Sequence, residues 1–205
     1  MDCSECFALI AFGICFLTFF FQLIHLIRLG NPKDFSKKSG NTCKAIKYSF
    51  TTAMMPKNKE SAYLHLPTYI AGILYHLGTF LSLLLFVLFV IFSLTHIQIP
   101  QIISLIIALC LVPTVISGLA ILIKRMFSKT LAVISGPDDY ISNIVTTMIQ
   151  LATLLFLVFP GTGSFYYITM TIFFLWLPIG KTRHLMYFFF ARYHLGYYYG
   201  WRGTW

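Results

Sequence analysis

Histidine is the side chain best placed to do chemistry in this chain, because it recurs in and beside long apolar stretches. Three stretches, 7–27, 66–123 and 140–180, contain no Asp, Glu, Lys or Arg. An ionisable group in such surroundings is costly, and by default it indicates function. The six histidines are His25, His65, His76, His96, His184 and His194.

The spacing of four of them predicts a matched arrangement on two helices. His65 and His76 are 11 residues apart, which is ~1100° of helix, about 20° from a whole number of turns, with ~16 Å of rise. His184 and His194 are 10 residues apart on a segment expected to run the opposite way. If the two segments pack antiparallel, His76 lies opposite His184 and His65 opposite His194.

Two facing imidazoles without thiolates or carboxylates between them suit the axial ligation of haem iron. Zinc would require three or four ligands. The short pair Cys3 and Cys6 lacks both a second pair and a following His, so it completes neither a zinc site nor a haem-attachment motif, and its role is left open. The sequence therefore predicts haem iron ligands at four histidines, with a fifth in reserve. The four are His65, His76, His184 and His194, and the reserve is His25.

Cations near the inner rim of such a bundle are expected to pair with haem propionates, which are poorly solvated there. Arg183 and Arg192 are predicted for this role, with Arg28 and Lys181 as further candidates. The quinone site is not placed by the sequence. Side chains able to hydrogen-bond a quinone head group are Gln22, Tyr69, Gln150, Tyr166 and Tyr167, and His96 is expected to lie in an exposed link.

The elements that must position these residues are membrane helices. Of the 205 residues, 58% are hydrophobic and only 10% are charged, whereas a soluble domain carries roughly 25% charged residues. One span needs about 20 apolar residues, and no strand-like alternation is visible. We predict an all-α bundle of five transmembrane helices forming one domain, 1–205. The spans are 6–28, 63–94, 100–123, 140–159 and 164–184, with a basic cytoplasmic loop 29–62 and an aromatic, basic tail 185–205.

Two segments outside the spans have two interpretations each. Residues 44–55 form either an amphipathic interfacial helix or a solvated loop. The aromatic cluster of the tail resembles an interfacial belt, and could equally be a face for a partner subunit.

The basic residues predict the orientation. All 15 Lys and Arg fall in 28–59, 124–129 or 181–202, which lie on one side of a five-span chain. By the positive-inside rule this side is cytoplasmic, so the N-terminus is outside and the C-terminus inside, in a multi-pass protein of the cell inner membrane. The net charge of +9 thus belongs to membrane loops, and nucleic acid is not an expected partner.

Several short motifs resemble the gamma subunit of respiratory nitrate reductase and related membrane cytochrome b subunits of heterodisulfide-reductase-like and sulfite-reductase-associated complexes. The shared pattern is five spans with the N-terminus out, two histidines about ten residues apart early in span two, and a Lys-Thr-Arg-His motif closing span five. A Gly-Pro-Asp-Asp-Tyr start to span four and a Met-Pro-Lys-Asn-Lys end to the first loop also match. These motifs occupy 63–66 with 74–78, 181–184, 136–140 and 55–59.

The resemblance implies a haem b protein that exchanges electrons with a membrane quinone such as menaquinone. It implies an iron–sulfur subunit docked on the cytoplasmic face, within a hetero-oligomeric complex. His65, His76 and His184 match ligand positions of that family. The fourth family position falls near Tyr166 and Tyr167, so either His194 replaces that ligand, or one haem is bound and His65 or His76 pairs with His184.

These features lead to a function prediction and an alternative. The prediction is an electron-transfer subunit of a quinone-linked oxidoreductase complex, with one or two haems b and no bond-making active site of its own. The alternative is a haem-free anchor or assembly subunit whose histidines form interhelical hydrogen bonds. A secondary transporter is disfavoured, because the sequence lacks an inverted repeat and an intramembrane carboxylate.

Overall fold

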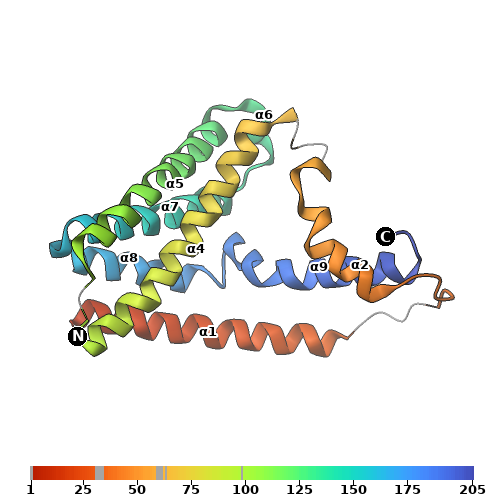
Figure 1. Cartoon of the computed structure of the whole chain (residues 1–205), viewed down its shortest axis with the longest axis horizontal. Coiled ribbons are helices and arrows are strands. Elements are labelled where there is room, and N and C mark those ends of the chain that lie inside the picture. The colour runs from red at the N-terminus through yellow and green to blue at the C-terminus, as the bar shows by residue number, and fades with distance from the viewer. Residues whose placement is uncertain (1, 31–34, 59–61, 63, 98) are drawn as a thin grey trace. The chain divides into compact units, whose positions relative to one another are not determined.

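Helices form all the regular structure in the part of the chain that the computed structural model describes, residues 2–30, 35–58, 62, 64–97 and 99–205 (Figure 1). The predicted all-α class is confirmed for these residues, while residue 63, at the start of the second predicted span, and residue 59 lie outside them. The α-helices are α1 (Cys3–Leu29), α2 (Thr42–Phe50), α4 (Leu66–Thr95), α5 (Gln101–Phe127), α6 (Lys129–Ile134), α7 (Pro137–Val158), α8 (Gly163–Trp176) and α9 (His184–Trp201). Short 3-10 turns lie at η1 (Thr52–Met54), η2 (Pro56–Asn58), η3 (Pro160–Thr162) and η4 (Lys181–Arg183).

Four of these helices, α1, α4, α5 and α7, are long and apolar enough to cross a membrane. A fifth span is counted if the bent pair formed by Pro160–Trp176 and Lys181–Trp201 is taken as one. Helices of this length and composition are those of a multi-pass membrane protein.

The chain divides into two compact units. The first, here called the membrane unit, comprises Met1–Thr18 and Pro67–Thr182, and the second, here called the basic unit, comprises Phe19–Leu66 and Arg183–Trp205. Helix α1 contributes its first part to the membrane unit and its second part to the basic unit.

In the membrane unit α7 packs against both α5 and α8. Small residues let the helices approach closely, because a side chain at Gly78 would collide with Thr114, and one at Gly118 with Tyr75 and Thr147. Close packing of small residues is the usual basis of helix association in lipid. The largest fully buried apolar side chains are Tyr166, Phe86, Phe173, Leu111, Ile149 and Met170.

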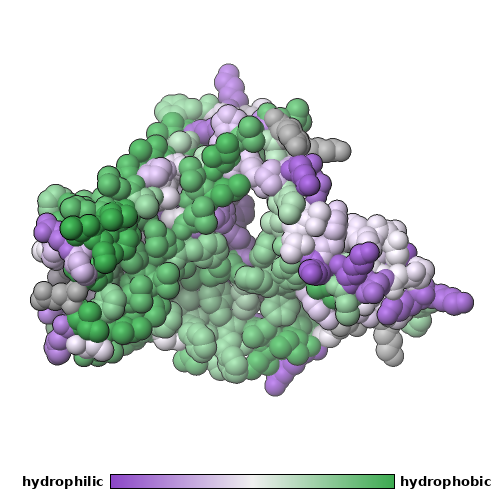
Figure 2. Space-filling model, viewed as in Figure 1, coloured by the Kyte–Doolittle hydropathy of each residue, from purple (hydrophilic) through white to green (hydrophobic). Residues whose placement is uncertain are grey.

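The outer surfaces of the same helices are strongly apolar. Leu109 of α5 is 71% exposed and Leu77 of α4 is 58% exposed. Hydrophobic residues cover much of the visible surface of α4 and α5 in Figure 2. Large apolar side chains directed outward on long helices are expected where lipid replaces water as the solvent.

The predicted fifth span, 164–184, is interrupted after Trp176. Pro178 has no backbone N–H and disfavours helical geometry at the residue before it, so the helix cannot continue regularly. The amide of Gly180 donates to the carbonyl of Trp176 at 2.9 Å, and a side chain at Gly180 would collide with the indole of Trp176. His184 therefore begins a separate helix, α9.

In the basic unit, α2 packs against α9, which lies beside it in Figure 1. The sequence left residues 44–55 as either a helix or a loop, and the structure shows a helix at 42–50. Asn41 caps it, since its Oδ1 accepts the amide of Lys44 at 3.1 Å. The side chains of Ala45 and Ser49 are fully buried, and a side chain at Gly196 of α9 would collide with the backbone of Ile46.

The tail of the chain folds back onto the first loop. The indole Nε1 of Trp201 donates to the carbonyl of Ser36 at 2.9 Å, and the carbonyl of Trp201 accepts the amide of Ser39 at 2.9 Å. Trp205 stacks on Tyr199 with 4.7 Å between ring centroids. The aromatic tail is thus used in part to close the basic unit on itself.

Candidate functional site

The six histidines all lie among the described residues, and all have exposed side chains. His76 and His96 belong to the membrane unit, and the other four to the basic unit. The pairing of His76 with His184 joins the two units and stays a prediction, as does that of His65 with His194. The four in the basic unit are His25 on α1, His65 in the turn before α4, and His184 and His194 on α9.

The imidazole of His76 is held by a contact within its own helix. Its Nδ1 lies 2.7 Å from the carbonyl oxygen of Gly72, one turn earlier in α4. A carbonyl can only accept, so Nδ1 donates this hydrogen bond. Contacts of this kind commonly orient metal-binding histidines.

The helix face that carries His76 is open one turn earlier. Gly72 lies on the same face of α4, and a side chain built there would meet open space. The neighbouring residue, Tyr75, points inward, where its hydroxyl donates to the carbonyl of Asn143 at 2.9 Å. Because Tyr75 fixes the rotation of α4, His76 is directed outward from the bundle.

The two histidines of α9 lie on one continuous helix. Ten residues correspond to ~15 Å of rise and about 80° of rotation, so His184 and His194 occupy two levels on neighbouring faces. Both side chains are exposed. The helix can thus offer imidazoles at two depths.

Two arginines border these histidines. The guanidinium of Arg183 lies 5.9 Å from the ring centroid of Tyr187, and that of Arg192 lies 5.6 Å from Phe188. Cation–π contacts of this kind restrain a guanidinium along the surface of its helix. Their predicted pairing with haem propionates stays a prediction.

The described residues contain no cluster of three His, Cys, Asp or Glu side chains that could bind a metal ion. An axial pair at haem iron needs only two imidazoles.

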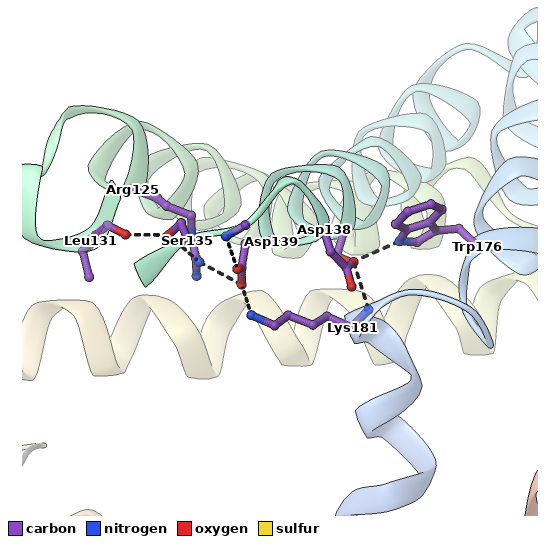
Figure 3. A network of polar contacts seen from close by, with 9 residues as sticks. Arg125, Leu131, Ser135, Asp138, Asp139, Trp176 and Lys181 are labelled. Atoms are coloured by element: carbon purple, nitrogen blue, oxygen red, sulfur yellow. Dashed lines mark hydrogen bonds and ion pairs between the residues drawn. The ribbon is translucent and has the colours of Figure 1, made fainter. Parts of the chain in front are cut away.

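A polar cluster that the sequence analysis missed joins α5, α7 and the segment after α8 (Figure 3). Asp139 accepts from Arg125 at 2.9 Å and from Lys181 at 2.6 Å. Its other oxygen accepts the amide of Gly136 at 3.0 Å, which caps α7. The Lys181 ammonium, a candidate partner of propionates, thus contacts a carboxylate of the same chain.

The neighbouring carboxylate closes the same junction. Oδ1 of Asp138 accepts the Ser142 hydroxyl at 2.8 Å and the Lys181 amide at 3.0 Å, and the Trp176 indole donates to Ser142 at 3.0 Å. The motifs 136–140 and 181–184 are therefore in physical contact. The sequence signal was a pair of acids in the first turn of an apolar helix, where negative charge is stabilised.

Two of the candidate quinone contacts are buried in the membrane unit. Gln150 is fully buried, and its amide nitrogen donates to the Tyr75 carbonyl at 3.0 Å and to the Thr79 hydroxyl at 2.9 Å. Tyr166 is also fully buried, stacked on Phe156 at 5.0 Å. Both side chains pack between helices, and their contact with a quinone stays a prediction.

Comparisons with known proteins provide no relative from which a role could be transferred. No family model matches the chain, and no curated protein or solved structure matches it. The functional argument therefore rests on the residues and contacts described above.

Proposed function

We propose that this chain is a membrane haem b electron-transfer subunit that passes electrons between the quinone pool and an iron–sulfur subunit on the cytoplasmic side. The observation that carries the proposal is the His76 imidazole, whose Nδ1 contacts the Gly72 carbonyl at 2.7 Å. This contact fixes the orientation of the ring on an apolar helix. Histidines that bind metals commonly make such a contact from one ring nitrogen to a backbone carbonyl.

In this proposal His76 and His184 would hold one haem iron, and His65 and His194 would hold a second if two haems are bound. His25 would be the reserve ligand, and haem would supply one-electron redox chemistry. The protein residues orient the imidazoles, exclude water through the apolar bundle, and place the cations Arg183 and Arg192 beside the α9 histidines. No residue of the chain is required to make or break covalent bonds in a substrate.

The proposed topology has five spans, with α8 and the turn after it supplying the fifth (164–184), an outer N-terminus and a cytoplasmic C-terminus in the cell inner membrane. The support is the placement of all 15 Lys and Arg residues in three segments that a five-span chain puts on one side. The contacts of Asp139 with Arg125 and Lys181 join two of these segments.

The proposed docking surface for the iron–sulfur subunit is the basic unit. It holds 11 Lys and Arg against 2 Asp and Glu. A surface of one sign steers an acidic partner and fixes its orientation.

The test is the absorption spectrum of the purified protein with a pyridine haemochrome assay. We expect a Soret band, alpha bands after dithionite reduction, and one or two haems per chain. Exchange of His76 or His184 for Gln should abolish at least one haem. The matched control is His96→Asn, because His96 has a φ of 56°, a conformation that Asn tolerates. A colourless wild-type preparation from haem-sufficient cells would refute the proposal.

The charge of the basic unit also favours a second candidate, a haem-free anchor or assembly subunit. In that case the His76→Gln and His184→Gln variants would retain assembly and activity of the larger complex. The electron-transfer proposal requires that both lose activity, so one pair of variants separates the two functions.

A further inference from the structure

Two cysteines share an exposed face in the first turn of α1. Cys3 and Cys6 are both free and exposed, and residues three apart lie on the same side of a helix. The intervening Glu5 is only 4% exposed and Ala8 is fully buried. The packed side of α1 thus faces the membrane unit, and the two thiols face outward.

The geometry of this turn is close to that of a disulfide. Side chains three residues apart have Cβ atoms about 5–6 Å apart, whereas a disulfide requires about 3.5–4.5 Å between Cβ atoms. The turn is closed by the Cys6 amide, which donates to the Asp2 carbonyl at 3.1 Å. The first amides of a helix have no partner within it, so tightening by about 1 Å disturbs few other contacts.

Both thiols are also accessible. Thiol–disulfide exchange requires that a cysteine sulfur reach a sulfur of the partner disulfide. Cys3 and Cys6 are free and exposed, so a partner disulfide can approach either of them.

We propose that Cys3 and Cys6 form a redox-active dithiol that undergoes thiol–disulfide exchange. One thiolate attacks a sulfur of a partner disulfide, a mixed disulfide forms, and the first partner thiolate leaves. The second cysteine then attacks the mixed disulfide, closing the Cys3–Cys6 bond and releasing the second partner thiolate. Two electrons pass from the cysteine pair to the partner disulfide, and the two cysteine protons end on the partner thiols.

The inference does not depend on haem. It depends on the proposed orientation only for its compartment, since an outer N-terminus would place the dithiol where disulfides persist. Haem content and thiol exchange are measured separately, so one proposal can fail while the other stands.

The test uses the full chain in detergent, equilibrated with reduced and oxidised glutathione at graded ratios, quenched with acid and alkylated with N-ethylmaleimide. Mass spectrometry should show Cys3 and Cys6 losing their maleimide adducts together, with the loss of two hydrogens and no bound glutathione. Cys43, the single cysteine of α2, is free and exposed outside the long apolar helices and is the internal control for single-thiol reactions. Independent alkylation of the two cysteines at every ratio would overturn the proposal, as would two glutathione adducts.

A single-cysteine variant sharpens the test. In Cys3→Ser, oxidation should leave Cys6 carrying one glutathione, because the resolving thiol is missing, and Cys6→Ser should behave alike at Cys3. If both variants resist glutathione as the wild type does, the protection seen in the wild type is not a disulfide and the proposal fails. A membrane-impermeant maleimide applied to intact cells then reports which side carries the pair.

Discussion

The membrane unit and the basic unit differ most clearly in charge. The membrane unit contains 4 Lys and Arg and 4 Asp and Glu, a net charge of zero, whereas the basic unit contains 11 and 2, a net charge of +9. The whole net charge of the protein therefore resides in the smaller part of the chain. The charged side chains are thus concentrated outside the long apolar helices α4, α5 and α7.

The two units also use polar groups in opposite ways. In the membrane unit polar side chains face inward, as with Gln150, which bonds to Tyr75 and Thr79. In the basic unit the interior is made of small residues such as Ala45 and Gly196, while the described lysines are exposed. Stability should thus depend on polar contacts in the first unit and on close backbone approach in the second.

The largest loss of stability is expected for Gly196→Leu in the basic unit. A Cβ at this position would lie 2.5 Å from the Ile46 Cα, and backbone cannot yield as a side chain can. We expect α2 and α9 to separate at a cost of about 3 kcal/mol or more, seen as faster tryptic cleavage at Lys44 and Lys47. The control is Gly13→Ala, since a side chain at Gly13 meets open space. Wild-type cleavage rates in the leucine variant would show that the two helices are not held in this way.

A smaller effect is expected for Asp139→Ala in the membrane unit. The change removes the carboxylate shared by Arg125 and Lys181, whose side chains are 30% and 60% exposed. The cost should therefore fall between that of a surface pair and that of a buried pair, about 2 kcal/mol. Thermal unfolding in detergent measures it, with Lys129→Ala as the control. Equal melting temperatures for the two variants would show that the Asp139 carboxylate does not stabilise the fold.

The smallest effect is expected for the double exchange Lys44→Gln and Lys47→Gln. Both side chains are exposed on α2, so the free energy of unfolding should change by less than about 0.5 kcal/mol. The melting temperature of the full chain in detergent checks this. A loss as large as that of the leucine variant would mean that charge, rather than packing, holds the basic unit.

The sequence was sufficient for the helical class and for the apolar segments, because lipid imposes length and composition on each span. It did not predict the contact between α2 and α9, since Ala45 and Gly196 are far apart in the chain and no local pattern connects them. The spacing of Gly196 and Gly200 was the available signal, as small residues four apart mark close helix approach.

In the candidate site, the sequence pointed to the histidines but not to the contacts around them. The histidines stood out because they lie in or beside stretches without charge, and the structure adds the Gly72 carbonyl that orients His76. The break after Trp176 changes the context of His184, which begins its own helix. Asp138 and Asp139 were noticed only as part of a short motif, because their partner Lys181 is more than 40 residues away.

The contact between α2 and α9 also has a consequence for biosynthesis. More than 130 residues separate the end of α2 at Phe50 from the start of α9 at His184. At about 5–20 residues per second, the ribosome needs on the order of ten seconds to supply the glycine-bearing helix that α2 requires. During that interval the small-residue face of α2 is uncovered, so the nascent first loop is the segment most in need of a chaperone or of the lipid surface.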